Sequence, residues 1–162
     1  MNIPTREESL RILKNNVPDN IIAHLKAVAE FSEKVMDILE KRGIKVNREL
    51  VRAAALLHDV KKMGPNHETR GAEYIKSLGY PEVANLILRH GLAKLNDENF
   101  VPKTWEEKIV FYSDKRLKDD RIVSVDERFD DIRKRYKRDI VEHEYQLTRK
   151  IEKELLGDEE LK

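Results

Sequence analysis

The stretch VRAAALLHDVKKM, residues 51–63, decides how the rest of the chain is arranged. Its small and apolar residues predict a helix that delivers His58 and Asp59 side by side and then ends, because Pro65 cannot continue a helix and Gly64 tolerates the backbone conformation beyond a helix end. An imidazole and a carboxylate that are adjacent in sequence can reach one metal ion only where the backbone ends or bends. The alternative is that His58 caps the helix, where a partly charged imidazole suits the negative end of the dipole, and that Asp59 faces water.

Length and charge place the chain among ordinary globular proteins. It has 162 residues, enough for one domain with a hydrophobic core. Charged residues make up 39%, well above the roughly 25% of an average soluble domain. This surface is typical either of the ion-pair networks of a heat-adapted protein or of surface helices rich in Glu and Lys. The formal net charge is +1, so we expect no general attraction to nucleic acid or to a membrane.

The chain contains no cysteine, which excludes a disulfide framework and a thiolate nucleophile or ligand. Any metal site must therefore use nitrogen and oxygen atoms. No apolar run approaches the roughly 20 residues of a membrane-spanning helix. The first ten residues, MNIPTREESL, lack the pattern of a targeting signal. We therefore expect a cytoplasmic protein with no membrane partner.

Helical periodicity covers nearly the whole chain, and no segment alternates with the period of two that is typical of strands. Four helices are predicted to begin after N-cap residues, namely Thr5, Asn47, Thr104 and Ser124. Pro81 suits the first position of another helix. The sequence therefore predicts an all-α fold, with residues 1–162 forming a single-domain bundle of about six to seven helices.

The C-terminal segment, residues 124–156, is predicted to be one long helix, because apolar residues recur in steps of three and four from Val125 to Leu155. This stripe can pack on the body of the domain, or its far half can pair with a second subunit to form a homodimer. His143 falls on the stripe, so we expect it to pack there and not to bind a metal.

Residues 92–103 form the longest segment without periodicity. Such a loop is either a lid beside a site or, more simply, a connector. Phe100 and Trp105 border it, and their rings could stack on a nucleotide base. A loop anchor for Phe100 and core packing for Trp105 are the simpler roles.

Four of the five histidines fall near predicted helix ends, where a helical bundle can gather ligands on one side. They are His24, His58, His67 and His90. Asp114 lies between Val110 and Leu117 on an otherwise apolar helix face, where an unpaired charge is costly. A single histidine is more often a surface or core residue, but the set, with Asp59, predicts a metal site. Imidazole and carboxylate ligands suit Mn, Fe, Co, Ni, Zn or Mg.

The order of these residues resembles the HD superfamily of metal-dependent phosphohydrolases over about residues 20–117, the expected core of the domain. AALLHDVKK is similar to the family's AALLHDIGK, HETRGAEYI to its H-x-x-x-GA segment, ANLILRHG to its later histidine helix, and IVFYSDKRL to its closing YADK. SVDERFDDIRKRY resembles the end of small stand-alone HD proteins. No glycine-rich phosphate loop, G-x-S-x-G or HExxH motif competes with this interpretation.

The resemblance implies a role for each of eight residues. The primary metal ligands are expected to be His24, His58, Asp59 and Asp114. Asp59 is also expected to help deprotonate water. His67 and His90 match catalytic positions that bind a second metal in some members and substrate phosphate in others. Lys62 and Lys115 are expected to contact phosphate.

Two positions depart from the family pattern. Lys61 replaces the glycine of HDIG, which puts the backbone after the ligand pair in doubt unless the lysine points outward. Ser113 replaces an alanine before the closing Asp114, a change of one small residue for another.

The implied function is hydrolysis of a phosphoester or phosphoanhydride in a small phosphorylated metabolite, namely a nucleotide or a dinucleoside polyphosphate. A di-iron oxygenase on the same positions and a non-catalytic nucleotide- or metal-binding module are the alternatives. Nucleic-acid binding by the basic residues 133–138 is disfavoured, because acidic residues are interleaved nearby. Arg116 is either a further phosphate contact or part of surface ion pairing.

Overall fold

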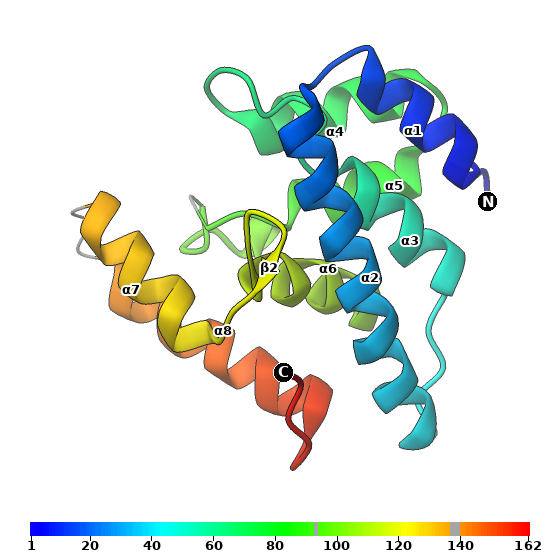
Figure 1. Cartoon of the computed structure of the whole chain (residues 1–162). Coiled ribbons are helices and arrows are strands. Elements are labelled where there is room, and N and C mark those ends of the chain that lie inside the picture. The colour runs from blue at the N-terminus through cyan, green and yellow to red at the C-terminus, as the bar shows by residue number, and fades with distance from the viewer. Residues whose placement is uncertain (93, 137–139) are drawn as a thin grey trace.

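The computed structural model describes residues 1–92, 94–136 and 140–162, and within them the fold is all-α, as predicted (Figure 1). The eight helices are α1 (Arg6–Lys14), α2 (Asp19–Lys41), α3 (Arg48–Leu57), α4 (His67–Ser77), α5 (Pro81–Leu88), α6 (Trp105–Lys115), α7 (Val125–Arg135) and α8 (Val141–Leu156). A short 3-10 turn, η1 (Glu98–Phe100), lies in the loop before α6. An antiparallel hairpin of two short strands, β1 (Leu117–Lys118) and β2 (Arg121–Ile122), follows α6 and was not predicted.

The predicted helix starts are confirmed by their caps. The side chains of Thr5, Asn47, Thr104 and Ser124 each accept a hydrogen bond from a backbone N–H in the first turn of the helix that follows. Glu107 completes a capping box with Thr104, so two otherwise unpaired backbone donors are satisfied together. Local sequence signals therefore fix where these helices begin.

Helix α2 lies at the centre of the bundle and packs against α3 and α6 (Figure 1). Ala53, Ala54 and Ala55 of α3 are buried, and small side chains there allow α3 to approach its neighbours closely. Helices α4 and α5 pack against each other, and α5 also contacts α3. Buried apolar side chains from every described helix join in one continuous core.

Helix α3 ends where its sequence predicts. His58 still has helical dihedral angles (φ −61°, ψ −29°), but the following residues form turns, in which Val60 N–H donates to the Leu57 carbonyl. Gly64 has φ +109°, a conformation that side chains other than glycine rarely adopt. The backbone therefore leaves the direction of the α3 axis directly after His58 and Asp59.

The prediction of one unbroken helix over residues 124–156 is wrong. Helix α7 ends at Arg135, Tyr136 is extended (φ −129°, ψ 122°), and α8 begins at Val141, while 137–139 lie outside the described residues. In an unbroken helix, Arg133 would stand one turn from Lys137, an unfavourable like-charge pair. The break also lets both halves bury their apolar faces, which a single straight helix would leave partly exposed.

The two halves instead pack against each other. The rings of Phe129 and Tyr145 lie 5.5 Å apart, the Tyr145 hydroxyl donates to Asp126 at 2.5 Å, and Arg133 pairs with Glu142 at 3.3 Å. Helix α8 also packs on α6 and α2, so this segment lies on the body of the domain. Pairing with a second subunit stays a prediction.

The break shifts the helical phase, which overturns the expectation for His143. The residues of α8 that turn inward are Val141, Glu144, Thr148, Ile151, Leu155 and Leu156. His143 is exposed and does not pack on the core. None of the described helices combines the length and apolar character that crossing a membrane requires.

Candidate metal centre

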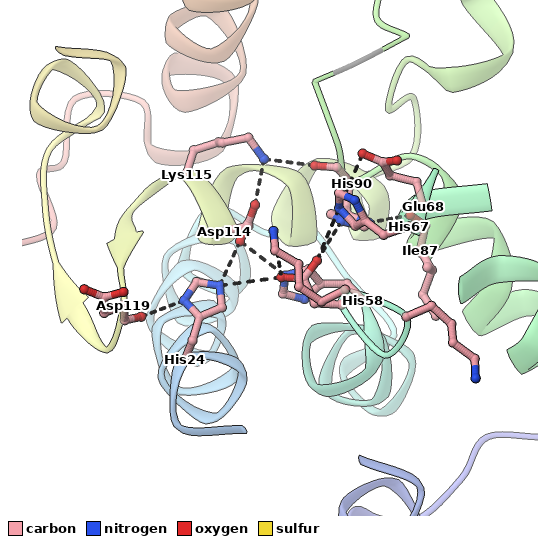
Figure 2. A network of polar contacts seen from close by, with 12 residues as sticks. His24, His58, His67, Glu68, Ile87, His90, Asp114, Lys115 and Asp119 are labelled. Atoms are coloured by element: carbon pink, nitrogen blue, oxygen red, sulfur yellow. Dashed lines mark hydrogen bonds and ion pairs between the residues drawn. The ribbon is translucent and has the colours of Figure 1, made fainter. Parts of the chain in front are cut away.

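Three separate segments bring the four expected primary ligands together, and Figure 2 shows three of them, His24, His58 and Asp114, converging. His24 lies on α2, His58 and Asp59 directly follow α3, and Asp114 lies in the last turn of α6. Asp114 Oδ1 is 3.1 Å from His24 Nε2 and 3.2 Å from His58 Nε2. Asp59 Oδ2 is 3.6 Å from His58 Nε2 and 4.0 Å from His24 Nε2. One ligand atom from each residue lies within 4.8 Å of all the others, which makes this group able to hold a metal ion.

A second group lies next to the first and shares Asp59 with it. The other carboxylate oxygen, Asp59 Oδ1, is 3.3 Å from His90 Nε2 and 3.5 Å from His67 Nε2. His67 is the first residue of α4, and His90 follows the end of α5. Asp59 therefore presents one oxygen to each group.

Backbone carbonyls orient three of the four imidazoles. The Nδ1 atom of His58 lies 2.8 Å from the Ala55 carbonyl, and that of His90 lies 2.5 Å from the Ile87 carbonyl. His24 Nδ1 lies 2.6 Å from the carbonyl of Asp119, in the turn of the β1–β2 hairpin. A hydrogen bond donated by Nδ1 fixes the tautomer in which Nε2 carries the free lone pair, as a metal ligand requires.

The residues present fit a divalent ion. His90 is 2% exposed, and its Nε2, although 3.3 Å from Asp59 Oδ1, makes no well-aligned hydrogen bond within the described residues. A buried polar nitrogen without a partner is costly, and a metal ion would satisfy it. The donor set contains only imidazole nitrogen and carboxylate oxygen, which suits borderline and hard divalent metals.

Both carboxylates are held in the ionised form that metal binding needs. Burial alone would raise the pKa of Asp59, but the neighbouring His58 and His90 outweigh it and hold that pKa well below its usual range. Burial acts against ionisation of Asp114 as well, but the Lys115 ammonium, His24 and His58 lower its pKa well below the usual value.

Two histidines shift in opposite directions. Burial opposes protonation of His24, but the hydrogen bond and charge of Asp114 outweigh it, so the pKa of His24 is raised. Burial is the main reason that the pKa of His67 is lowered, although Asp59 and Glu68 act in the other direction. The neutral imidazole that a metal requires is therefore more easily maintained at His67 than at His24.

Lys115 has contacts other than those expected for a residue that binds phosphate. It is 3% exposed, and its Nζ donates to Asp114 Oδ2 at 2.8 Å and to the His90 carbonyl at 2.9 Å. These bonds connect a ligand of the first group with the backbone of the second. Its position favours orienting Asp114 over reaching a substrate.

Lys62 stays the candidate for phosphate contact. Its Nζ lies 3.9 Å from Asp59 Oδ2, and its side chain is 45% exposed, so the ammonium reaches both the ligand pair and solvent. Arg116 does not take this role. It is buried, and it donates to the Val123 carbonyl and the Tyr112 hydroxyl, each at 2.6 Å, and to the Leu161 carbonyl.

Lys61 points away from the ligands. Its Nζ donates to Asn16 Oδ1 at 2.8 Å and lies 4.2 Å from the centre of the Tyr74 ring. The lysine that replaces the family glycine thus ties the turn after Asp59 to the turn that follows α1 and to α4. Ser113 is fully buried, as a small residue in a closely packed helix should be.

Sequence reasoning missed two charged residues beside the site. Arg70 on α4 donates to three backbone carbonyls of the loop after α3: Lys61 at 3.1 Å, Met63 at 2.8 Å and Pro65 at 2.7 Å. A Cβ added to Gly64 would lie 2.9 Å from the Arg70 guanidinium, so this glycine makes room for it. In the sequence, Gly64 is the one residue that indicates a close approach of another group to this loop.

Glu68 is the second missed residue. Its Oε1 lies 3.4 Å from His67 Nε2, and a Cβ added to Gly91 would lie only 2.3 Å from the same oxygen. Lys94 and Phe100 line a small hollow with Glu68, and the Lys94 ammonium lies 4.7 Å from the Phe100 ring centre. The described part of the loop over residues 92–103 therefore lies beside the second group. Trp105 packs partly buried against the core.

Comparison with known proteins agrees with the resemblance found in the sequence. The HD domain model matches residues 21–130. An uncharacterized protein of Methanocaldococcus jannaschii is 32% identical, over 94% of this chain and 95% of that protein. Proteins described as tRNA (cytidine(56)-2'-O)-methyltransferases, from Picrophilus torridus and Thermoplasma volcanium, are 32% and 30% identical over 79% and 86% of this chain, but the match spans only 40% and 44% of their own lengths. No solved structure matches the chain.

Proposed function

This chain belongs to the HD domain family, and from that premise we propose that it is a metal-dependent phosphohydrolase acting on a small phosphorylated metabolite. The observation that carries the proposal is the shared carboxylate of Asp59, with two oriented imidazoles at Oδ2 and two more at Oδ1. Such a set can bind one or two divalent ions and leave positions open for water and phosphate.

A divalent ion bound there supplies a Lewis acid and lowers the pKa of coordinated water toward ~7. The residues of the chain then have distinct tasks. Asp59, ionised and buried between the two groups, is placed to accept the proton of a water beside it. Lys62 and, where no second metal is bound, His67 and His90, each donating through an Nε2–H, stabilise the charge that grows on the phosphoryl oxygens. Lys115 keeps Asp114 in place.

A nucleotide or a dinucleoside polyphosphate is the substrate class that we propose. Phe100, beside the second group, is available to contact a base, whereas Trp105 packs on the core. The test is phosphate release from mononucleotides and dinucleoside polyphosphates by protein stripped of metal and reloaded with Mn, Fe, Co, Ni, Zn or Mg. Turnover that depends on one of these metals supports the proposal, whereas equal phosphate release by Asp59→Ala protein contradicts it.

The metal count separates the mechanisms. One metal ion per chain in both the parent protein and His67→Ala indicates a mononuclear site in which His67 faces the substrate. A fall from two ions to one on that substitution indicates a binuclear centre. Two tightly bound irons that consume oxygen with a substrate present would favour the di-iron oxygenase on the same residues.

The tRNA methyltransferase relatives favour a second candidate, in which the substrate phosphate belongs to tRNA. The near-neutral net charge argues against it, since nucleic-acid binding is dominated by contacts to phosphates. Addition of tRNA to the nucleotide assay distinguishes the two. Under the primary proposal, tRNA neither inhibits turnover nor loses phosphate.

A further inference from the structure

A second hollow lies away from the metal centre, between the segment that leads into α1 and the helices α2 and α3. Its volume is about 460 Å³, within the usual range of small-molecule sites. None of the residues that line it belongs to either ligand group. It is therefore separate from the metal centre, although it lies against α2, which carries His24, and α3, which leads into His58.

Small side chains create the space. Ala29 of α2 and Ala53 of α3 are buried on facing walls, and Pro4 and Leu56 complete an apolar floor. Ser9 of α1 also lines the hollow. It is fully buried, and its Oγ has no hydrogen-bond partner in the part of the chain that the structure describes. A buried hydroxyl without a partner is uncommon and suggests that something else supplies one.

The rim carries an excess of negative charge. Glu33 is neutralised by Arg48 at 2.8 Å and by Arg52. Glu30 and Glu49 also line the hollow. Glu49 acts electrostatically on Arg52, which is itself paired with Glu33, and Glu30 has no ion pair within 4 Å among the described residues. Arg6 is the lining cation without such a partner among the described residues. Three carboxylates and two guanidinium groups therefore line the hollow, which leaves one negative charge in excess.

We propose that this hollow binds a small aliphatic ammonium compound that carries a second polar group. Glu30 and Glu49 attract its positive charge, the apolar lining of Pro4, Ala29, Ala53 and Leu56 receives its hydrocarbon body, and Ser9 Oγ bonds to its second polar group. A charge-assisted hydrogen bond and the burial of several methylene groups together are sufficient for weak, specific binding.

Three probes of equal chain length test the charge and the hydroxyl separately: 6-amino-1-hexanol, hexylamine and 6-hydroxyhexanoate. Binding is followed by chemical-shift changes of backbone amides in the full chain without substrate. We expect saturable shifts at the lining residues with both amines, tighter binding of the amino alcohol, and none with the anion. In Ser9→Ala protein the amino alcohol should bind no better than hexylamine.

The charge assignment has its own variant. Glu30→Gln combined with Glu49→Gln should weaken amine binding by about tenfold or more. Glu73→Gln combined with Glu98→Gln is the matched control, because both residues are exposed, lie outside the hollow and change the net charge equally. Absence of saturable shifts with either amine, or equal binding of the anion through Arg6, overturns the proposal. Phosphohydrolase activity is not used, so this result does not bear on the metal centre.

Discussion

Lys115 Nζ lies 2.8 Å from Asp114 Oδ2, while Asp114 Oδ1 faces His24 and His58. One oxygen of this carboxylate is thus bound by a buried ammonium, and the other is left for a metal. The same ammonium donates to the carbonyl of His90, so it joins the two ligand groups from outside. Such a partner behind a ligand fixes the ligand's orientation.

Replacing Lys115 with Met should weaken metal binding by about 10- to 100-fold, the usual cost of losing a residue that orients a ligand. The metal-free protein should also lose about 3 kcal/mol of unfolding free energy, because Asp114 loses the ammonium of a buried ion pair. Metal titration and urea unfolding measure the two effects. A variant that binds metal normally but has a raised KM would instead assign Lys115 to substrate phosphate.

Asp59→Asn should abolish activity and reduce bound metal at both groups, because one oxygen of the shared carboxylate becomes an amide nitrogen that cannot serve as a ligand. Elemental analysis and phosphate release measure this. His143→Asn is the matched control, since this histidine is exposed and outside both groups. Loss of metal from the His143 variant would show that the last helix had been placed wrongly.

Arg70→Ala should lower kcat/KM markedly while it changes the free energy of unfolding little. The guanidinium binds three carbonyls of the loop that leads from Asp59 and Lys62 to His67, so its removal frees the loop but leaves the core intact. We expect a fall in kcat/KM of about tenfold or more, since small displacements of catalytic groups have large effects. Arg70→Lys should recover little, because an ammonium cannot span three acceptors as a planar guanidinium does. Full activity in Arg70→Ala would remove Arg70 from the positioning of the site.

Gly91→Ala should displace the Glu68 carboxylate, because the new Cβ would lie 2.3 Å from Oε1. If Glu68 acts on His67, this variant loses activity, and the loss is smaller when Glu68 has already been replaced by Ala. A double-mutant cycle on kcat/KM measures the coupling. Additive losses of kcat/KM would show that Gly91 and Glu68 affect activity independently, and not through contact between the new Cβ and the carboxylate.

The ligands could be found from the sequence because each stands where a helix signal is strong. The small residues before His58 predict the helix that ends at Leu57, Gly64 and Pro65 predict the turn that follows it, and Asp114 could be identified as a charge on an apolar face. Side chains that donate hydrogen bonds to backbone carbonyls cannot be recognised in this way, because no sequence pattern marks the acceptor. Arg70 looks like an ordinary surface charge in the sequence, because nothing in the pattern shows that its guanidinium binds carbonyls of the preceding loop. Lys115 was expected from the resemblance to contact phosphate, and its bonds to Asp114 and to the His90 carbonyl could not be predicted from the sequence.

The C-terminal region shows a different limit. The steps of three and four from Val125 to Leu155 continue through Tyr136, so periodicity alone predicts one helix. The break is decided by tertiary packing, in which α7 folds back on α8. The hairpin of β1 and β2 is equally hard to predict, because each strand is only two residues long.

Removing the metal should lower the thermal stability of the protein without unfolding it at room temperature. The continuous apolar core holds the helices together, so the fold does not depend on the ion alone. A metal that binds only the folded state stabilises it in proportion to the logarithm of its concentration over Kd, about 4 kcal/mol at a thousandfold excess. Scanning calorimetry with chelator and with added metal measures this shift. Asp59→Asn protein should show no shift, and an equal shift in that variant would place the stabilising ion elsewhere.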